Sequence, residues 1–156
     1  SASLLYLSIF VYFIFIIESN YTDLKIYLLY SVLVAILSDI GGLVFGKTFK
    51  GKKLTKISPN KTVSGSIGSF VSSMILIPIF YNELITYDLL TLIILTIVIS
   101  LISQIGDLFV SLLKRKAKVK DTSDLLPGHG GLLDRLDGII FAAPLGILLL
   151  NFFKLI

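Results

Sequence analysis

The residues best suited to chemistry gather in one stretch near the end of the chain, residues 111–137. Within it, basic residues precede a glycine-rich turn, and Asp134 and Asp137 follow it. Basic side chains can neutralise phosphates, and glycines let backbone amides approach a ligand closely. Two aspartates three residues apart at the start of a helix can face one point. The stretch therefore predicts a phosphate-binding site. The basic residues and glycines expected to contact the phosphates are Lys114, Arg115, Lys120, Gly128, Gly130 and Gly131.

A third carboxylate, that of Asp107, lies in the apolar segment just before this stretch. An ionised carboxylate inside a membrane costs at least about 2 kcal/mol unless it is paired, hydrated or bound to a metal, which makes Asp107 a functional candidate. Together with Asp134 and Asp137 it offers three hard oxygen donors beside a basic loop, and such donors suit Mg²⁺ that carries substrate phosphates. The predicted reaction class is phosphoryl or nucleotidyl transfer.

Each of these residues also has a plainer interpretation. Asp134 or Asp137 alone could cap the last helix, and Arg135 between them could be only an ion-pair partner. His129, the only histidine, could act as a general base, bind phosphate or shape the turn. The sequence contains no Walker phosphate loop, dinucleotide-binding glycine motif or Ser-His-Asp arrangement.

The elements that must position these residues are membrane helices. Of the 156 residues, 55% are hydrophobic and 15% are charged, and the mean hydropathy is +0.94. The apolar residues come in blocks close to the roughly 20 residues that a helix needs to cross a bilayer. Cysteine is absent, which excludes disulfides and thiolate metal sites. We predict an all-α, polytopic transmembrane helical bundle that forms a single integral-membrane domain over residues 1–156, with about five spanning helices at residues 4–17, 26–45, 63–81, 84–113 and 138–153.

The positive charge is confined to two loops. Every lysine and arginine except Lys25 and Lys154 lies within residues 47–61 or 114–137. Cytoplasmic loops carry an excess of basic residues, and two crossings separate these loops, so both are predicted to face the cytoplasm. Anionic lipid headgroups account for the net charge of +4 better than nucleic acid does, and we expect no nucleic-acid partner.

Polar side chains mark one side of the fourth apolar segment. At roughly 100° per residue they fall within one arc that leads to the basic loop: Ser100, Ser103, Gln104, Asp107, Ser111 and Lys114. The stripe could border a polar cavity or form a hydrogen-bonded seam between helices, and Asp107 favours the cavity. Asp39 in the second segment could join the site or pair locally, and Gly42 and Gly46 are interpreted as helix packing.

These motifs together resemble the CDP-diacylglycerol synthase (phosphatidate cytidylyltransferase) family. Residues 111–137 are similar to its signature along their whole length, from Ser-Leu-Leu-Lys-Arg through Leu-Pro-Gly-His-Gly-Gly-Leu to Asp-Arg-Leu-Asp. Upstream, residues 104–108 resemble the segment that precedes this signature, and residues 57–62 resemble a second cytoplasmic motif. Asp39 and Gly46 fall where the family has a polar helix end, so the resemblance covers roughly residues 39–153.

The resemblance implies an enzyme of phospholipid biosynthesis in which the phosphate of phosphatidic acid attacks the α-phosphorus of CTP, giving CDP-diacylglycerol and pyrophosphate. It also implies a homodimer in the lipid bilayer of a bacterial cytoplasmic membrane, and Mg²⁺, with a second cation left open, held by Asp107, Asp134 and Asp137. The residues expected to be catalytic are Asp107, Lys114, Arg115, Asp134 and Asp137. Those expected to bind substrate are Lys61, Thr62, Ser111, Lys120, His129, Gly130, Gly131 and Arg135.

The chain departs from the family pattern at two points. Ser64 stands where the family usually has an acidic residue, so any role of a carboxylate there is lost or taken over elsewhere. Members are also generally longer at the N-terminus, and we expect this chain to be the C-terminal catalytic portion of a longer fold. The competing hypotheses are another CTP-dependent membrane lipid enzyme, such as a polyprenol kinase or the archaeal ether-lipid cytidylyltransferase, a transporter, or a purely structural membrane subunit.

Overall fold

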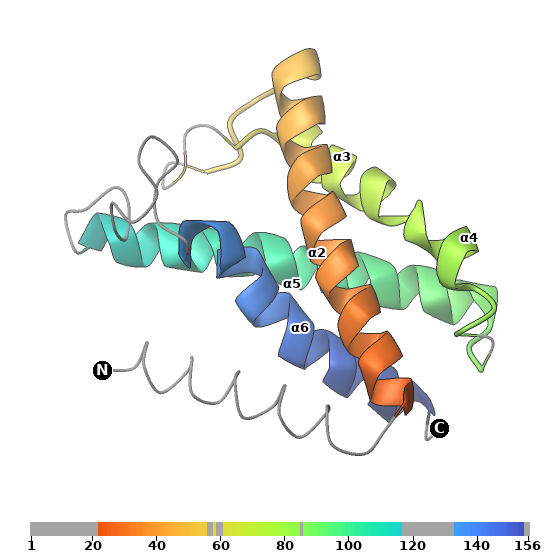
Figure 1. Ribbon diagram of the computed structural model, residues 1–156. Coiled ribbons are helices and arrows are strands. Elements are labelled where there is room, and N and C mark those ends of the chain that lie inside the picture. The colour runs from red at the N-terminus through yellow and green to blue at the C-terminus, as the bar shows by residue number, and fades with distance from the viewer. Residues whose placement is uncertain (1–21, 56–57, 59–60, 85, 117–132, 155–156) are drawn as a thin grey trace.

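The computed structural model describes residues 22–55, 58, 61–84, 86–116 and 133–154, with the backbone alone for 22–23 and 133–136. Within these residues the regular elements are helices, and the only β feature is an isolated antiparallel bridge between Lys53 and Thr62. The all-α prediction is confirmed. The helices are α2 (Thr22–Phe49), α3 (Val63–Ser73), α4 (Leu76–Phe80), α5 (Leu89–Lys116) and α6 (Leu133–Lys154), as Figure 1 shows.

Four stretches of the described chain are long and apolar enough to cross a membrane. They coincide with four of the five predicted segments, while the predicted segment 4–17 lies outside the described residues. The chain is therefore an integral membrane protein. The four stretches are Leu24–Phe49, Val63–Phe80, Leu89–Lys116 and Asp137–Lys154.

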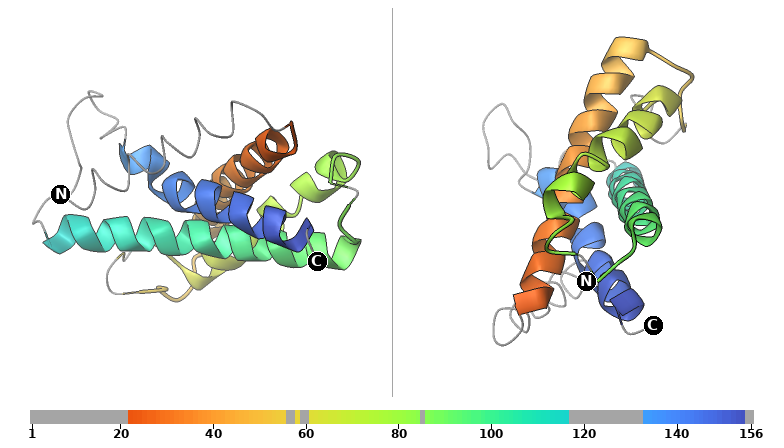
Figure 2. Two further views of the ribbon diagram at one scale, coloured as in Figure 1. Left: turned by 90° about the horizontal axis from the view of Figure 1, so that it is seen from below. Right: turned by 90° about the vertical axis from the view of Figure 1, so that its right-hand side faces the viewer.

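The long helix α2 holds the bundle together. It packs against α3, α5 and α6, and α5 and α6 also pack against each other (Figure 2). Two pairs of hydroxyl groups join α2 to α5 in the core: Tyr30 with Thr96 at 2.6 Å, and Ser38 with Ser100 at 2.9 Å. Because buried hydroxyls are costly without partners, these pairs fix how the two helices sit along each other. The fully buried apolar side chains around them include Val34, Leu92, Ile99, Ile147 and Leu150.

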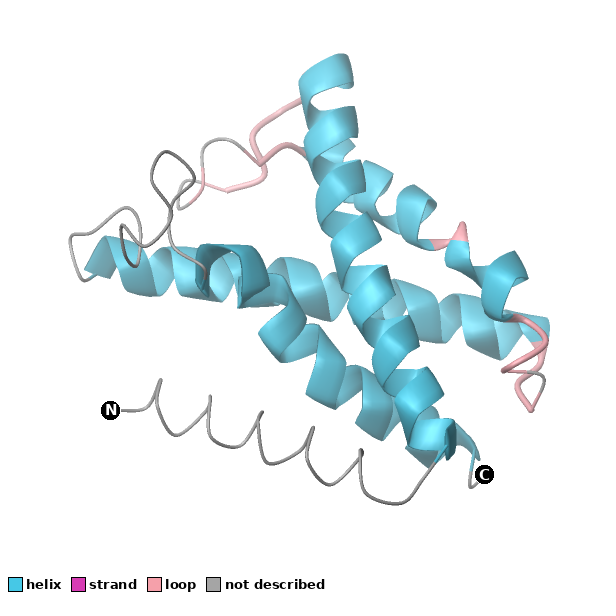
Figure 3. Ribbon diagram, viewed as in Figure 1, coloured by secondary structure: helices cyan, strands magenta, loops and turns pink. Residues whose placement is uncertain are grey.

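The predicted segment 63–81 is a broken helix rather than a continuous one. Helix α3 ends at Ser73 and α4 begins at Leu76, with a short turn between them (Figure 3). Pro78 explains the break, because proline has no amide hydrogen to donate to the carbonyl of Met74 and its ring crowds that carbonyl.

Helix α5 begins later than the predicted segment 84–113, at Leu89. Its first turn is capped by Asp88, whose carboxylate accepts a hydrogen bond from the Thr91 amide at 3.3 Å. Hydrogen bonds from the Thr91 side chain and amide also hold the pKa of Asp88 below its ordinary value. Leu84, just before this cap, is buried and belongs to the core rather than to the helix.

Glycines let α2 and α3 approach each other closely. A Cβ placed on Gly41 would lie 2.6 Å from the carbonyl oxygen of Gly68, and one placed on Gly65 would lie 2.6 Å from that of Gly42. Since these neighbours are backbone atoms, they cannot turn away as a side chain could. The interpretation of Gly42 and Gly46 as packing residues is confirmed, because their virtual Cβ atoms would also meet residues that belong to α3 or cap it.

We expect the substitution Gly41→Ala to lower the free energy of unfolding by about 1–3 kcal/mol, because the added methyl group must push α3 away from α2. Thermal unfolding of the protein in detergent would measure the loss. Val44→Ala provides the control, since Val44 is on the same helix and 49% exposed. A loss no larger for Gly41→Ala than for Val44→Ala would contradict the close contact.

Candidate functional site

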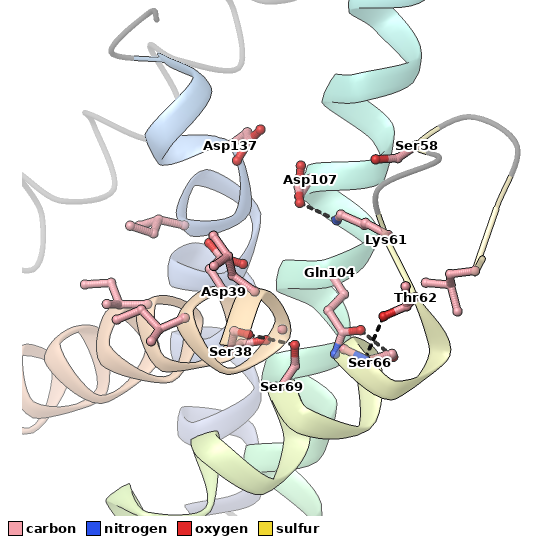
Figure 4. A pocket seen from close by; sticks show the side chains of 17 residues that line it. Ser38, Asp39, Ser58, Lys61, Thr62, Ser66, Ser69, Gln104, Asp107 and Asp137 are labelled. Atoms are coloured by element: carbon pink, nitrogen blue, oxygen red, sulfur yellow. Dashed lines mark hydrogen bonds and ion pairs between the residues drawn. The ribbon is translucent and has the colours of Figure 1, made fainter. Parts of the chain in front are cut away.

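A cavity of about 580 Å³ lies where α2, α3, α5 and α6 meet the loop that precedes α3 (Figure 4). One part of its lining is polar and the other is apolar. The polar lining residues are Ser38, Asp39, Ser58, Lys61, Thr62, Ser66, Ser69, Gln104, Asp107 and Asp137. The apolar ones are Ile36, Ile40, Leu43, Leu54 and Ile139.

Three carboxylates from three helices share this cavity. Asp39 comes from α2, Asp107 from α5 and Asp137 from α6, and Figure 4 shows them around the same space. The side chain of Asp107 is 25% exposed, whereas Asp137 retains only 5% of its surface. Three negative charges that share one cavity between apolar helices repel one another and lose hydration. They need positive charges nearby to compensate them.

Two lysines compensate the carboxylates. Lys61 forms an ion pair with Asp107, and the Lys114 ammonium lies 3.9 Å from an Asp137 carboxylate oxygen. The hydroxyl of Ser111 is directed at the other oxygen of Asp107, at 3.5 Å. The structure thus brings five of the predicted site residues close to one another: Asp107, Asp137, Lys114, Ser111 and Lys61. Their functional roles stay a prediction.

The loop before α3 holds Lys61 in place through its backbone. The Lys61 amide donates to the Ser58 carbonyl at 3.1 Å, and the Lys61 carbonyl accepts from the Leu54 amide at 2.8 Å. The next residue, Thr62, is the N-cap of α3, and its hydroxyl accepts from the Gly65 amide at 3.1 Å. Hydrogen bonds thus hold the backbone on both sides of the Lys61 side chain.

The polar stripe on α5 has both of the roles considered for it. At its deeper end, Ser100 bonds to Ser38 of α2 and forms a seam between helices. Further along, Gln104 and Asp107 border the cavity, where the amide oxygen of Gln104 accepts a hydrogen bond from the Ser66 hydroxyl at 2.6 Å. The stripe changes from seam to cavity lining along α5.

Asp39 is the main addition to the predicted site. The sequence left open whether it joins the site or pairs locally, and the structure places it in the cavity lining opposite Asp107. Its position inside an apolar segment was the available signal, because an ionisable residue in a membrane span is a functional candidate by default. Ser58, Ser66 and Ser69 also line the cavity and carried no such signal.

Several predicted site residues are not brought to the cavity by the described part of the chain. Arg115 is exposed in the last turn of α5 and is not among the lining residues. Ser111 and Lys114 do not line the cavity either, but they approach Asp107 and Asp137, which do. Asp134 and Arg135 lie in the first turn of α6, but their side chains are outside the description. The remaining predicted residues lie outside the described residues altogether: Lys120, His129, Gly130 and Gly131.

The chemistry of the lining fits a magnesium ion in part. Carboxylate oxygens are the ligands that Mg²⁺ prefers, and this ion usually takes one or two of them together with water and substrate phosphates. Among the residues described, no group of three carboxylate or histidine side chains is placed to hold a single ion. Asp107 and Asp137 could supply two ligands, and the predicted third, Asp134, has no described side chain.

Comparison with known proteins places these observations in a family context. A family model described as "Cytidylyltransferase family" matches residues 1–153. The phosphatidate cytidylyltransferase of Staphylococcus haemolyticus (strain JCSC1435) is 43% identical over 122 residues, which cover 76% of this chain and 46% of that protein. Those of Staphylococcus saprophyticus and Staphylococcus aureus (strain COL) are 40% and 41% identical over 136 residues, or 85% of this chain and 52% of each relative. The chain thus spans about half the length of these relatives.

We expect Thr62→Val to lower the free energy of unfolding by about 1 kcal/mol, because valine keeps the shape of threonine but cannot accept the hydrogen bond of the Gly65 amide. Thr62→Ser is the matched control and should unfold close to the wild type. The two variants would be compared by thermal unfolding in detergent. If Thr62→Val is as stable as Thr62→Ser, the cap does not hold the start of α3.

Proposed function

The chain belongs to the cytidylyltransferase family, and from this premise we propose that it carries the catalytic site of a phosphatidate cytidylyltransferase. The proposed reaction transfers the cytidylyl group of CTP to phosphatidic acid and forms CDP-diacylglycerol and pyrophosphate. The observation that carries the proposal is a cavity in a membrane bundle that is lined by three carboxylates, Lys61 and apolar side chains, with Lys114 beside the Asp137 carboxylate. The names of the staphylococcal relatives support the same reaction.

The reaction joins two phosphate groups, so neutralisation of charge is its main requirement. An oxygen of the phosphatidic acid phosphate attacks the α-phosphorus of CTP, and the bond from that phosphorus to the bridging oxygen of the β-phosphate breaks. A phosphate monoester is already largely ionised at neutral pH, so the nucleophile needs no general base. Under this proposal Lys61, in the cavity lining, and Lys114, beside Asp137, would neutralise the phosphates.

We further propose that Mg²⁺ is held by Asp107 and Asp137, with Asp134 as a third ligand. When bound, it would screen the phosphate charges and stabilise the charge that develops on the leaving pyrophosphate. The hydroxyl of Ser111 orients the Asp107 carboxylate, and Lys114 does the same for Asp137. A carboxylate held by such neighbours keeps its oxygens directed at one place.

The two kinds of lining suit the two parts of a lipid substrate. The lining combines three carboxylates and Lys61 with the apolar side chains of Ile36, Ile40, Leu43 and Ile139. Ile40 and Leu43 are more than half exposed on α2. Acyl chains would gain by contact with these apolar side chains, while the phosphate would reach the lysines.

We propose that loops 47–61 and 114–137 face the cytoplasm of a bacterium and that the bundle spans its cytoplasmic membrane. The basic residues of both loops support this orientation. So does the site, because Lys61 and Lys114 belong to these two stretches and lie beside Asp107 and Asp137, which line the cavity where CTP would arrive from the cytosol. The homodimer implied by the family resemblance stays a prediction.

The reaction is tested by CTP-dependent conversion of phosphatidic acid in lipid-containing detergent micelles, with labelled CTP followed into the lipid extract. We expect the wild type to form CDP-diacylglycerol, and chelation of divalent cations to stop it until Mg²⁺ is restored. Asp107→Asn and Asp137→Asn should each reduce the rate by about a hundredfold or more, since each removes a charge needed in the transition state.

Asp88→Asn is the control for this assay. Asp88 immediately precedes α5 and is exposed at the end of that helix that lies away from Asp107. Asparagine caps a helix as well as aspartate does, so the substitution should leave the helix start intact. Its activity should equal that of the wild type. Full activity in both Asp107→Asn and Asp137→Asn would refute the carboxylate site, and product from polyprenol instead of phosphatidic acid would refute the proposed substrate.

The absence of cysteine makes the orientation directly measurable. Lys53→Cys places a thiol in the first basic loop, and Glu83→Cys places one in the turn before α5; both positions are exposed. A membrane-impermeant maleimide added to intact bacterial spheroplasts should label Glu83→Cys and should label Lys53→Cys only after the membrane is opened. The reverse pattern would show that the basic loops face outward.

A further inference from the structure

The contact between Lys61 and Asp107 raises a question about the proposed site. The Lys61 ammonium lies on the Asp107 carboxylate, which is the group proposed to bind Mg²⁺ (Figure 4). A lysine and a divalent cation held by the same carboxylate repel each other. The binding of one therefore opposes the binding of the other.

We propose that Lys61 is the resident counter-cation of Asp107, that a divalent cation displaces it from this carboxylate, and that the released ammonium then binds a substrate phosphate. This inference rests on the proposed function. It assigns Lys61 two partners in succession, Asp107 in the empty site and a phosphate in the filled one. It also makes Lys61 a residue that links cation binding to phosphate binding.

Charge compensation explains why a resident cation is needed. Asp39, Asp107 and Asp137 line the cavity, and Lys61 is the one basic residue among the described lining residues. Without Lys61, Asp107 would lose its counter-cation and the three carboxylates would repel one another. The ion pair therefore stabilises the empty cavity, and a divalent ion that carries twice the charge can replace it.

The geometry allows Lys61 to move while its backbone stays in place. Its amide and carbonyl are both hydrogen-bonded within the loop, to Ser58 and Leu54. Its side chain is 26% exposed at the cavity, whereas that of Lys114 is 14% exposed. A lysine also carries a compact charge on a flexible four-carbon stem, so its ammonium can turn from one anion to another.

The exchange has a thermodynamic consequence. In the empty site, a cation must break the Lys61–Asp107 pair before it can bind Asp107, so Lys61 weakens cation binding. Removal of the lysine charge should therefore strengthen the binding of a divalent cation alone. Breaking a partly exposed ion pair accounts for about 1 kcal/mol, which corresponds to a five- to tenfold change in affinity.

The test measures Mn²⁺ binding by electron paramagnetic resonance with the whole chain in phosphatidylcholine nanodiscs, without CTP or phosphatidic acid. We expect Lys61→Gln to bind Mn²⁺ about five- to tenfold more tightly than the wild type. Lys61→Arg should bind it no more tightly than the wild type, because arginine keeps the charge and pairs with carboxylates through two hydrogen bonds. Thermal unfolding would check that each variant is folded.

Two further variants isolate the pair. Lys53→Gln removes the same charge from an exposed position in the same loop and should change the Mn²⁺ affinity less than twofold. In an Asp107→Asn background, Lys61→Gln should no longer strengthen Mn²⁺ binding, because the contested carboxylate is gone. Equal or weaker binding by Lys61→Gln in the otherwise wild-type chain would overturn the inference, as would an equal gain in Lys53→Gln.

The outcome is separable from that of the lipid assay. If the wild type forms CDP-diacylglycerol but Lys61→Gln binds Mn²⁺ no more tightly, the inference fails and the proposed function stands. If Lys61→Gln binds Mn²⁺ more tightly but the wild type forms no lipid product, the exchange stands and the proposed reaction fails. If neither the wild type nor the two Lys61 variants bind Mn²⁺, the inference is overturned together with the metal role of Asp107.

Discussion

The compensation of negative charge inside an apolar bundle is the constraint on which the rest of this structure depends. Asp39, Asp107 and Asp137 come from three membrane helices and meet at one cavity. Their ionised forms are tolerable there only because cations lie beside them. The cations come from the borders of the spans, Lys61 from the loop before α3 and Lys114 from the last turn of α5. The hydrogen bonds that shape this loop therefore belong to the site as much as the helices do.

Contacts deeper in the bundle determine where the carboxylates stand. The Ser38–Ser100 and Tyr30–Thr96 hydrogen bonds fix the position of α2 along α5. Asp39 follows Ser38 directly, so the same bonds decide how far Asp39 lies from the carboxylate on α5. The close contact of α2 and α3 at Gly41 and Gly65 acts in a similar way. It holds the start of α3 against α2, and Lys61 directly precedes the α3 cap, Thr62. Packing that looks purely structural thus sets the distances on which the charge balance depends.

Local information was enough to predict some features and not others. The spans follow from runs of apolar residues, because a membrane helix satisfies its own backbone and needs no partner to be recognised. The break before α4 was also readable from Pro78 and was missed. The Lys61–Asp107 contact was not readable, since it depends on how α2, α3 and α5 cross. Thr62 shows the same dependence on tertiary structure. The sequence motif predicted a contact with substrate, and the structure shows that its hydroxyl caps α3 and that the residue also borders the cavity.

The sign of the charge at this cavity constrains how an anionic substrate can bind. Three carboxylates facing a single lysine leave the described lining negative, and such a lining repels a nucleotide or a lipid phosphate. Under the proposed function, phosphates can enter only together with added positive charge or after it. The carboxylates are then required for phosphate binding, because they hold the divalent cation that makes the charge of the site positive. The lysine that balances them in the empty site becomes available for the phosphate at the same moment, so the two binding events favour each other.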